Sequence, residues 1–524
     1  MKPHYLLLAG NLLLTGLTFA QTPAKQWDRT LGGSINEYLS AMQPTRDGGS
    51  IVVGTSESTL SGDKTQEWRG LADYWVVKLD AQGQQQWDRT LGGSGEESAT
   101  CVVATADGGY LVGGHSSSAA SGDKSQDPYG LASDYWVVKL DAQGRPQWDR
   151  TLGGSGSEQL TSLVQTLDGG YLLGGSSDSP ASGDKTQPNL GSRDYWVVKL
   201  DALGRKQWDR TLGGAQADEL SSARQLPDGS YLLAGHSRSG VSGDKTQPSQ
   251  GSYDYWLVKL DAQGRKLWDR ALGGSENDYL SEMQLTDDDG ALLAGTSYSG
   301  TSGDKTQPSL GSSDYWLVKV DAQGRRQWDR SYGTPGEDQL VDLTRTADGG
   351  YLFGHRGNRD YRVTKLDARG NPQWDRTLQA GGGYTALAKV CATPDGGYLL
   401  GGVASADVAD DKSEPNRGNS LYTDYWVVKL APTVLASRPG TQAASPHVFP
   451  NPTRGAFTVE LPADAPRTGL QLDLVNVLGS VVYQQALAAA TQLTVPAGVV
   501  PPGMYWVRLR GPQSYLATQR VILN

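Results

Sequence analysis

The chain is poor in the residues that most often carry chemistry. Its 524 residues include two cysteines and five histidines, and the patterns GxSxG, HExxH, CxxC and the phosphate-binding loop do not occur in it. A formal net charge of −10 disfavours a nucleic-acid partner, which attracts basic patches. After the first twenty residues no run is long and apolar enough to span a bilayer, so we expect no transmembrane anchor in the mature chain.

The sequence is instead rich in one repeating unit. The tripeptide WDR occurs seven times, at spacings of 60, 61, 60, 60, 60 and 46 residues. An element DYW (once DYR) and a turn DGG, or a variant of it, recur with the same period. Self-similarity at a long period indicates a repeat architecture. The WDR copies start at Trp27, Trp87, Trp148, Trp208, Trp268, Trp328 and Trp374.

Each unit is predicted to form four short strands. The DYWVVKLD segment, as at Asp194, alternates two sets of side chains and contains the aromatic and β-branched residues typical of strands. The DGG and DAQG segments supply the Asp and Gly that tight hairpin turns need. Four antiparallel strands per unit predict the radial blades of a β-propeller. A linear β-solenoid is the alternative, although its repeats are usually shorter.

The two ends of the repeat array complement each other. The first WDR strand, Gln26–Gly33, precedes every other strand, whereas the last unit, Leu387–Leu430, lacks a WDR strand. Pairing the two removes an exposed sheet edge. We therefore predict an all-β fold, with a seven-bladed β-propeller over residues 21–430 that is closed by its N-terminal strand.

Thirteen of the fifteen tryptophans fall in the WDR and DYW elements, and we interpret them as packing residues. Trp68, in the first long loop, is an exception and a candidate for stacking on a ligand. The Asp and Arg of WDR recur once per unit, so we interpret them as structural and not catalytic.

The units resemble a known family. Asp134–Gly154 (DYWVVKLDAQGRPQWDRTLGG) and the segment after it are similar to the bacterial β-propeller repeat family of secreted proteins, and the similarity covers residues 21–430. The resemblance implies a propeller fold and export but no defined activity. The sixth unit departs from the pattern, because it is 14 residues shorter and contains DYRVTKLDARG.

Function is expected in the irregular loops, which should all emerge on one face. This face carries acidic residues and repeats of S-G-D-K-[ST]-Q, and it is the candidate ligand face. It could hold calcium, although no EF-hand-like loop is present; alternatively, the repeated Ser, Gly, Asp and Lys simply form turns. The candidate residues are Glu97, Glu158, Glu219, Asp278, Asp338, Asp63, Asp123, Asp184, Asp244, Asp304 and Trp68.

The cysteines and histidines are expected to be structural. Cys101 and Cys391 lie in equivalent strands of the second and last units, which are not adjacent in a ring, so we expect buried thiols and no disulfide. His115, His236 and His355 lie near the ends of strands in the second, fourth and sixth units. Spread around a ring, they are not expected to meet at one metal ion.

The two ends of the chain indicate export. Residues 1–20 combine a basic start, an apolar run and small residues near the end, as in a secretory signal peptide; a membrane anchor is the alternative. Residues 431–446 are rich in Pro, Ala and Ser and are predicted to be a linker. Residues 447–524 alternate short strands and predict a small C-terminal β-sandwich.

This C-terminal segment carries a second resemblance. The stretch PNPTRG from Pro450, LVNVLGSVV from Leu474, PGMY from Pro502 and a terminal apolar strand resemble the type A C-terminal sorting domain of type IX secretion in Bacteroidota. The resemblance implies recognition by the type IX secretion machinery and delivery to the cell surface or beyond. Gln519-Arg520 stands where the family frequently has lysine. The matching residues are Pro450, Asn451, Pro452, Gly455, Leu478, Gly479, Gly503 and Tyr505.

Three functions remain open on the sequence. The first is a non-enzymatic surface or secreted propeller that binds a glycan or a protein through its loop face, with no cofactor. The second is a glycan-acting hydrolase or lyase, which should break the repeat with carboxylates, a Tyr or a His unique to one blade. The third is a purely structural surface protein.

Overall fold

The computed structural model describes residues 22–356 and 360–432, and within 447–523 all but 452, 454, 462–469, 477–480, 488–491 and 511–514. It divides into two compact units, Met1–Val434 and Leu435–Asn524. The predicted signal peptide and residues 433–446 of the predicted linker lie outside the described residues.

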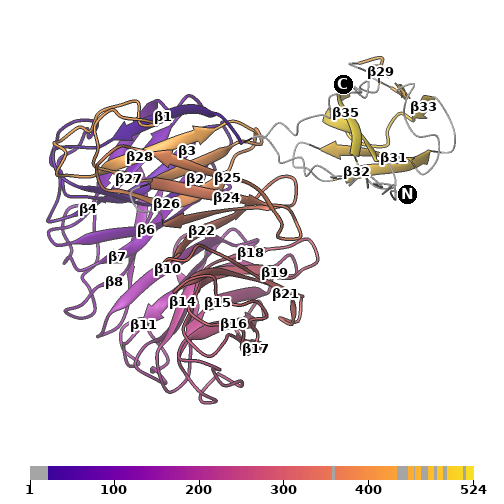
Figure 1. Ribbon diagram of the computed structural model, residues 1–524. Helices are drawn as coiled ribbons and strands as arrows, with labels where there is room; N and C mark the ends of the chain where they lie inside the picture. The colour runs from indigo at the N-terminus through magenta and orange to yellow at the C-terminus, as the bar shows by residue number, and fades with distance from the viewer. Residues whose placement is uncertain are drawn as a thin grey trace, which may run out of the picture. The chain divides into compact units, whose positions relative to one another are not determined.

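The larger unit is built entirely from antiparallel four-stranded sheets (Figure 1). Six of its described sheets each contain four strands that are consecutive in sequence. The first three sheets are β2 (Glu37–Pro44), β3 (Ser50–Ser56), β4 (Asp73–Leu79) and β5 (Gln85–Leu91); β6 (Glu97–Ala104), β7 (Tyr110–Ser116), β8 (Asp134–Leu140) and β9 (Pro146–Leu152); and β10 (Glu158–Gln165), β11 (Tyr171–Ser177), β12 (Asp194–Leu200) and β13 (Lys206–Leu212).

The next three sheets repeat this order. They are β14 (Asp218–Gln225), β15 (Tyr231–Ser237), β16 (Asp254–Leu260) and β17 (Lys266–Leu272); β18 (Asp278–Leu285), β19 (Ala291–Ser297), β20 (Asp314–Val320) and β21 (Arg326–Tyr332); and β22 (Leu340–Arg345), β23 (Tyr351–Arg356), β24 (Asp360–Leu366) and β25 (Pro372–Gln379).

The seventh described sheet joins the two ends of the repeat array. It contains β26 (Thr385–Ala392), β27 (Tyr398–Ala404), β28 (Asp424–Leu430) and, from the N-terminus, β1 (Lys25–Leu31). β1 pairs antiparallel with β28, so that Trp27 lies opposite Lys429 and Leu31 opposite Tyr425. The predicted pairing of the first WDR strand with the last repeat is therefore confirmed.

The sheets follow one another around a closed ring. The first strand of each sheet contacts the first strand of the next, and β26 of the last sheet contacts β2 of the first. Each apolar core of this unit lies between two neighbouring sheets, as where Leu232 of β15 packs with Leu293 of β19. The described strands thus form a propeller-like ring and not the open rod of a solenoid.

The DYW strand lies inside each sheet and accounts for much of the core. All residues of β12 are buried, because this strand has a neighbour on both sides and a sheet packed on each face. The tryptophan of DYW is fully buried in six sheets, which agrees with its interpretation as a packing residue. The WDR aspartate accepts a hydrogen bond from the indole Nε1, as Asp209 does from Trp196 at 3.2 Å, and is structural.

The smaller unit contains two sheets. One has strands β29 (His447–Phe449), β30 (Phe457–Glu460) and β33 (Gln492–Val495), and the other has β31 (Leu470–Asn476), β32 (Val481–Leu487), β34 (Gly503–Arg510) and β35 (Tyr515–Leu523). One apolar core draws Val459 and Val495 from the first sheet and Leu472, Val507 and Val521 from the second.

The sorting-motif residues that the structure describes lie close to the terminal strand of this unit. The Asn451 side-chain Oδ1 accepts a hydrogen bond from the Ile522 amide at 2.9 Å, and Tyr505 is buried with its hydroxyl donating to the Pro501 carbonyl at 2.8 Å. Pro450 is exposed. Gly455 lies in a bend just before β30, and Gly503 is the first residue of β34. Pro452, Leu478 and Gly479 lie outside the described residues.

Candidate functional site

Four of the ten acids predicted for the ligand face are buried, so the expectation of an exposed face does not hold for them. Glu97, Glu158, Asp278 and Asp338 have at most 4% of their surface exposed. The Gly93 amide donates to the Glu97 carboxylate at 2.7 Å, and corresponding bonds form in the other units. The reason is that the loop turns back into the sheet interface, where its amides need acceptors that water cannot supply.

These acids also meet the aspartates of DYW in pairs. Burial and the neighbouring carboxylate of Glu158 together raise the pKa of Asp134 to about 7. The pKa of Asp424, next to Glu37, is likewise raised to about 7, first by burial. Such pairs favour a shared proton, so the inner part of the loop ring carries less negative charge than the sequence suggests.

The aspartates of the S-G-D-K loops are half-buried, and we find them engaged within the protein. Asp63 pairs with Arg417 at 2.6 Å and Asp123 with Arg69 at 3.1 Å. Asp304 accepts from the Gln250 side chain. The Asp184 amide donates to the Gly153 carbonyl at 2.8 Å, and the Asp244 amide donates to the Gly213 carbonyl at 2.7 Å. The loop lysines are buried, so the turn-forming interpretation of this loop is supported.

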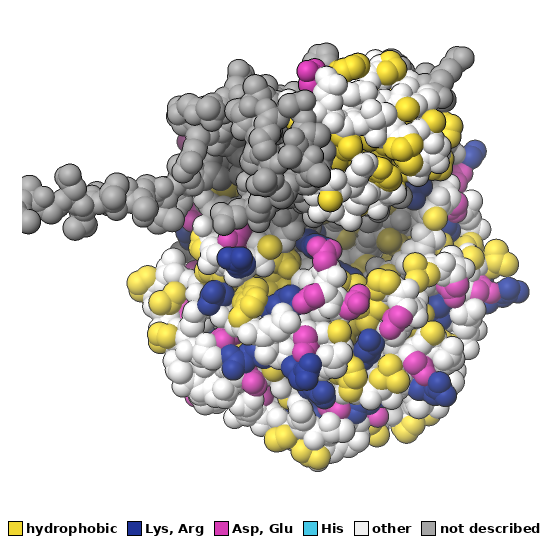
Figure 2. All heavy atoms as spheres, turned by 90° about the vertical axis from the view of Figure 1, so that its right-hand side faces the viewer, with side chains coloured by type: hydrophobic (Ala, Val, Ile, Leu, Met, Phe, Trp, Pro, Cys, Tyr) yellow, Lys and Arg dark blue, Asp and Glu magenta, His cyan; other side chains and the backbone are white. Residues whose placement is uncertain are grey.

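Two of the predicted residues do reach solvent. Trp68 is 43% exposed, and the Glu219 side chain is 41% exposed beside His236 at 3.7 Å. Figure 2 shows acidic and basic side chains interspersed over the visible part of the larger unit. The predicted acidic face therefore reduces to a few separate exposed groups, and the candidate site has to be sought elsewhere.

A cavity lies where the first strands of the seven described sheets meet. It has a volume of about 570 Å³ and is lined by β2, β6, β10, β14, β18, β22 and β26. We call it the channel. One position per strand lies two residues after an apolar residue near the start of the strand, and its residue lines the channel in every one of these strands but β14. In chain order, the residues at this position are Ala41, Cys101, Ser162, Ser222, Glu282, Asp342 and Lys389.

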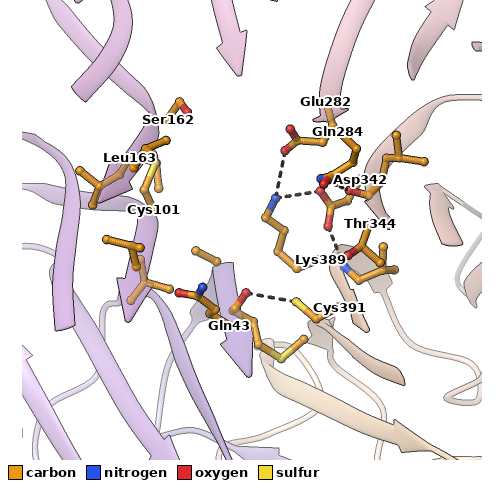
Figure 3. Close-up of a pocket in the computed structure, with 18 of the residues that line it drawn as sticks. Gln43, Cys101, Ser162, Leu163, Glu282, Gln284, Asp342, Thr344, Lys389 and Cys391 are labelled. Carbon is orange, nitrogen blue, oxygen red and sulfur yellow. Dashed lines mark hydrogen bonds and ion pairs between the residues drawn. The ribbon is translucent and has the colours of Figure 1, made fainter. Parts of the chain in front are cut away.

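Three consecutive sheets place charges at this position (Figure 3). Lys389 Nζ lies 2.8 Å from Asp342 Oδ1 and 3.8 Å from Glu282 Oε2. The Arg224 guanidinium lies 2.8 Å from Glu282 Oε1, which also accepts from the Ser222 hydroxyl at 2.6 Å. We call these four ionisable residues the channel cluster; its two carboxylates and two cations balance in charge.

The channel cluster perturbs its own members. Burial raises the pKa of Glu282, but Arg224 and Lys389 outweigh this effect and hold the pKa below its ordinary value. Burial and the nearby Glu282 leave the pKa of Asp342 raised in spite of Lys389. The pKa of Lys389 is raised, because the two carboxylates outweigh the effect of burial. Lys389 is therefore a permanent cation that offers hydrogen-bond donors to the channel.

The cysteines also line the channel and are free (Figure 3). Burial raises the pKa of Cys101 to about 11 and that of Cys391 to about 12. The Cys391 thiol donates to the Met42 carbonyl at 3.2 Å. Both thiols stay protonated at neutral pH and are poor nucleophiles.

The sequence interpretation missed the channel cluster although a signal was present. In the aligned repeats, the residue two positions after the apolar residue near the start of the first strand varies in type, and it is charged only at Glu282, Asp342 and Lys389. Positions that support the fold recur in every unit, whereas this position does not. The ring closure then brings these side chains, about 50–60 residues apart in sequence, to one place.

Residues 447–524 match the family model described as the secretion system C-terminal sorting domain. The predicted type IX sorting domain is thereby confirmed, and the chain is a sorted protein of the cell surface or the extracellular space. No helix among the described residues is long and apolar enough to cross a membrane.

Other similarities are partial. The chain is 27% identical over 214 residues to the regulatory protein FlaEY of Caulobacter vibrioides, covering 39% of this chain and 22% of that protein. PorZ of Porphyromonas gingivalis, a surface component of the type IX secretion system, is similar in structure with a TM-score of 0.40, 11% identity, and coverage of 92% of this chain and 59% of PorZ. The Pan2 WD40 domain of Neurospora crassa is similar in structure with a TM-score of 0.44 and 10% identity. The match covers 78% of this chain and 96% of that domain. None of these similarities assigns a ligand to this chain.

Proposed function

We propose that this surface-sorted chain is a seven-bladed β-propeller, closed by its N-terminal strand and followed by a small β-sandwich, that binds an extracellular ligand without catalysing a reaction. We place the ligand site in the channel and not on the acidic loops. Four-stranded sheets in a closed ring support the blade count, and the single core shared by two sheets of the smaller unit supports the sandwich.

The observation that carries the proposal is the divergence of one inner position among otherwise similar units. Ser162 and Ser222 occupy it in two sheets, so the fold does not require a charge there. Buried ion pairs add little to stability compared with neutral residues of similar size. The charge-balanced channel cluster is therefore better explained by recognition of a ligand than by folding.

The channel chemistry suits a polar ligand rich in hydroxyl groups. Donors and acceptors on Lys389, Gln43, Gln284 and Thr344 face a cavity that is also lined by the apolar Leu163. A volume of about 570 Å³ lies in the range of small-ligand sites. We propose the end of a surface glycan as the ligand, with a protein segment as the alternative and no cofactor required.

A glycan array with the full mature chain tests this function. The triple variant Glu282→Ser, Asp342→Ser, Lys389→Ser removes three of the four charges and copies the residue found in two sister sheets. The remaining charge, Arg224, has a side chain that is 27% exposed to solvent. We expect the triple variant to lose the array signal. The matched control Glu219→Gln, on the loop face, should bind as the wild type does, and EDTA should have no effect.

The outcomes separate the three functions. Binding that survives the triple variant but fails in the Glu219→Gln control would return the site to the loop face. Cleavage of a bound glycan, detected as new chain ends by mass spectrometry, would establish the glycan-acting enzyme instead. Wild-type silence on glycan and protein arrays alike would favour a purely structural surface protein.

A further inference from the structure

The sixth described sheet departs from its sisters at three points that meet in one place. The loop between its second and third strands is shortened, as the spacing of 46 residues between Trp328 and Trp374 shows. The tryptophan of DYW is replaced by Arg362. The glycine that lies opposite this tryptophan in the sister sheets is replaced by His355, which pairs with Arg362 across β23 and β24.

In the six sister sheets, an indole fills this place. Its Nε1 donates to the WDR aspartate at 3.0 to 3.2 Å, and its ring lies 4.5 to 4.9 Å from the DYW tyrosine of a neighbouring sheet. The same aspartate accepts a hydrogen bond from a Ser or Thr amide of the long loop, as Asp269 does from Thr246 at 2.9 Å. These aspartates are buried, with at most 9% of their surface exposed.

In the sixth sheet, the corresponding groups lose those partners. Asp375, the WDR aspartate, is exposed, and the hydroxyl of Thr364 is its hydrogen-bond donor among the described side chains. The Tyr315 hydroxyl donates elsewhere: it lies 3.0 Å from Asp338 Oδ1 and 3.0 Å from His355 Nδ1. Gly235 is the counterpart of His355 in a sister sheet, and a Cβ added to Gly235 would lie only 2.6 Å from the Tyr195 hydroxyl. A histidine at this position therefore requires the tyrosine hydroxyl to take a different partner, as Tyr315 does.

The result is a second cavity, which we call the sixth-sheet pocket. Its volume is about 320 Å³, and its lining includes the counterparts of the two groups that hold the indole in the sister sheets, Tyr315 and Asp375. Aromatic rings of Tyr332 and Phe353 form further wall, and Arg362 adds a guanidinium. The lining therefore combines ring faces with two carboxylates and one cation. Of the carboxylates, Asp338 already accepts from the Tyr315 hydroxyl, whereas Asp375 is exposed.

The buried polar groups of this pocket keep fixed protonation states at neutral pH. Burial, and then the positive charge of Arg362, lower the pKa of His355 to about 4, so its ring is neutral. Burial and the Asp338 carboxylate raise the pKa of Tyr315, so its hydroxyl keeps its proton. Because that proton is donated to Asp338, His355 Nδ1 is assigned as the donor to the tyrosine oxygen.

We propose that the sixth-sheet pocket binds a planar nitrogen heterocycle with an acidic substituent, its ring N–H donating to Asp375 and its ring lying against Tyr315. The sister sheets supply the template, since each holds an indole by these two contacts. Arg362, in place of the tryptophan, pairs with the acidic substituent. This site is separate from the channel, and its residues belong to different strands.

Calorimetric titration of the full mature chain with free tryptophan tests the site. The wild type should bind tryptophan and should bind 1-methyltryptophan, which lacks the ring N–H, about tenfold more weakly. A peptide with an internal tryptophan and blocked ends should bind as weakly as indole, because it lacks the carboxylate for Arg362. Equal binding of the peptide and free tryptophan would instead make a protein side chain the ligand and remove the role of Arg362.

Two variants locate the binding. Asp375→Ala removes the proposed acceptor from an exposed position, leaves no buried charge unpaired, and should abolish the preference for tryptophan over its methylated form. The double variant His355→Gly, Arg362→Trp introduces the glycine and tryptophan that the sister sheets have at these positions. The new indole should fill the sixth-sheet pocket and abolish binding. Glu219→Gln is the control and should bind normally. Absence of wild-type binding, or binding that persists in the double variant, would overturn the proposal.

Discussion

The closure of the ring by β1 gives the sharpest test of the fold. Removing residues 22–33 from the mature chain deletes the strand that pairs with β28 through six residue pairs. It also removes the buried Leu31, and the Asp28 carboxylate that accepts hydrogen bonds from Trp426 at 3.1 Å and from the Ser413 amide at 2.8 Å. The exposed edge of β28 would then be free to pair with other chains.

The expected loss of stability is large. Removing a buried leucine costs about 2–5 kcal/mol. Each backbone hydrogen bond adds about 1 kcal/mol of net stabilisation, and the indole of Trp426 is left with an unpaired donor. Together these losses are comparable with the free energy of unfolding of a typical domain, which is about 5–15 kcal/mol. We therefore expect the truncated propeller to be unfolded or aggregated at 37 °C.

Complementation in trans distinguishes closure from a general effect of truncation. A synthetic peptide of residues 22–34 (TPAKQWDRTLGGS) added to the truncated protein should restore cooperative thermal unfolding, followed by circular dichroism. The same peptide with Leu31→Ala should restore it less well, and a scrambled peptide should not restore it. A truncated protein that melts at the temperature of the full chain would refute the inference that β1 closes the ring.

Three further predictions follow from the same structure. The folded-state pKa of Asp134 is raised to about 7 beside Glu158 and lies above the ordinary value of 3.8. The contribution of this proton to stability is therefore fully present below pH 3.8 and is lost as the pH rises through 7. The urea midpoint should therefore fall between pH 5 and pH 8, and a midpoint that rises over this window would contradict the shared-proton pairs. Cys101 and Cys391 should react slowly with iodoacetamide in the native protein and rapidly in urea, as followed by mass spectrometry; rapid native labelling would show that the thiols are not held protonated. Deleting residues 447–524 should abolish delivery to the cell surface, measured by surface proteolysis of intact cells, and a shortened protein that still reaches the surface would contradict the sorting role.

The sequence predicted features that depend on local pattern. The alternation in DYWVVKLD and the Asp-Gly turns are properties of a few neighbouring residues, and they indicate strands and hairpins correctly. The unmatched strand before Trp27 predicts closure, because a missing partner at one end and a surplus at the other are visible in the repeat itself. The sorting domain was recognisable from ordered short motifs near Pro450 and Gly503.

The expected exposure of the loop-face acids fails for four of the ten, because polarity in sequence does not specify exposure. Glu97 and Glu158 are surrounded by Gly, Ser and Asp, which is typical of an exposed loop. In the fold, these residues are buried because the loop amides and serines need carboxylate acceptors at the interface between sheets. The sequence analysis also grouped His355 with His115 and His236, although His355 lies one residue earlier in its strand. His236 lies opposite the DYW tyrosine and His355 opposite Arg362 at the tryptophan position, so the two side chains point to opposite faces of their sheets.

The sequence by itself determined the repeated four-strand unit, the strand that completes the last unit and the sorting tail, because each follows from chemistry within a few residues or from counting copies. Only the tertiary structure decided where the chain can bind. Glu282, Asp342 and Lys389 become neighbours because the ring brings the first strands of successive sheets together. Likewise, Tyr315 and Asp375 enclose a cavity only because one sheet omits the indole and the loop that fill the same place in its sisters.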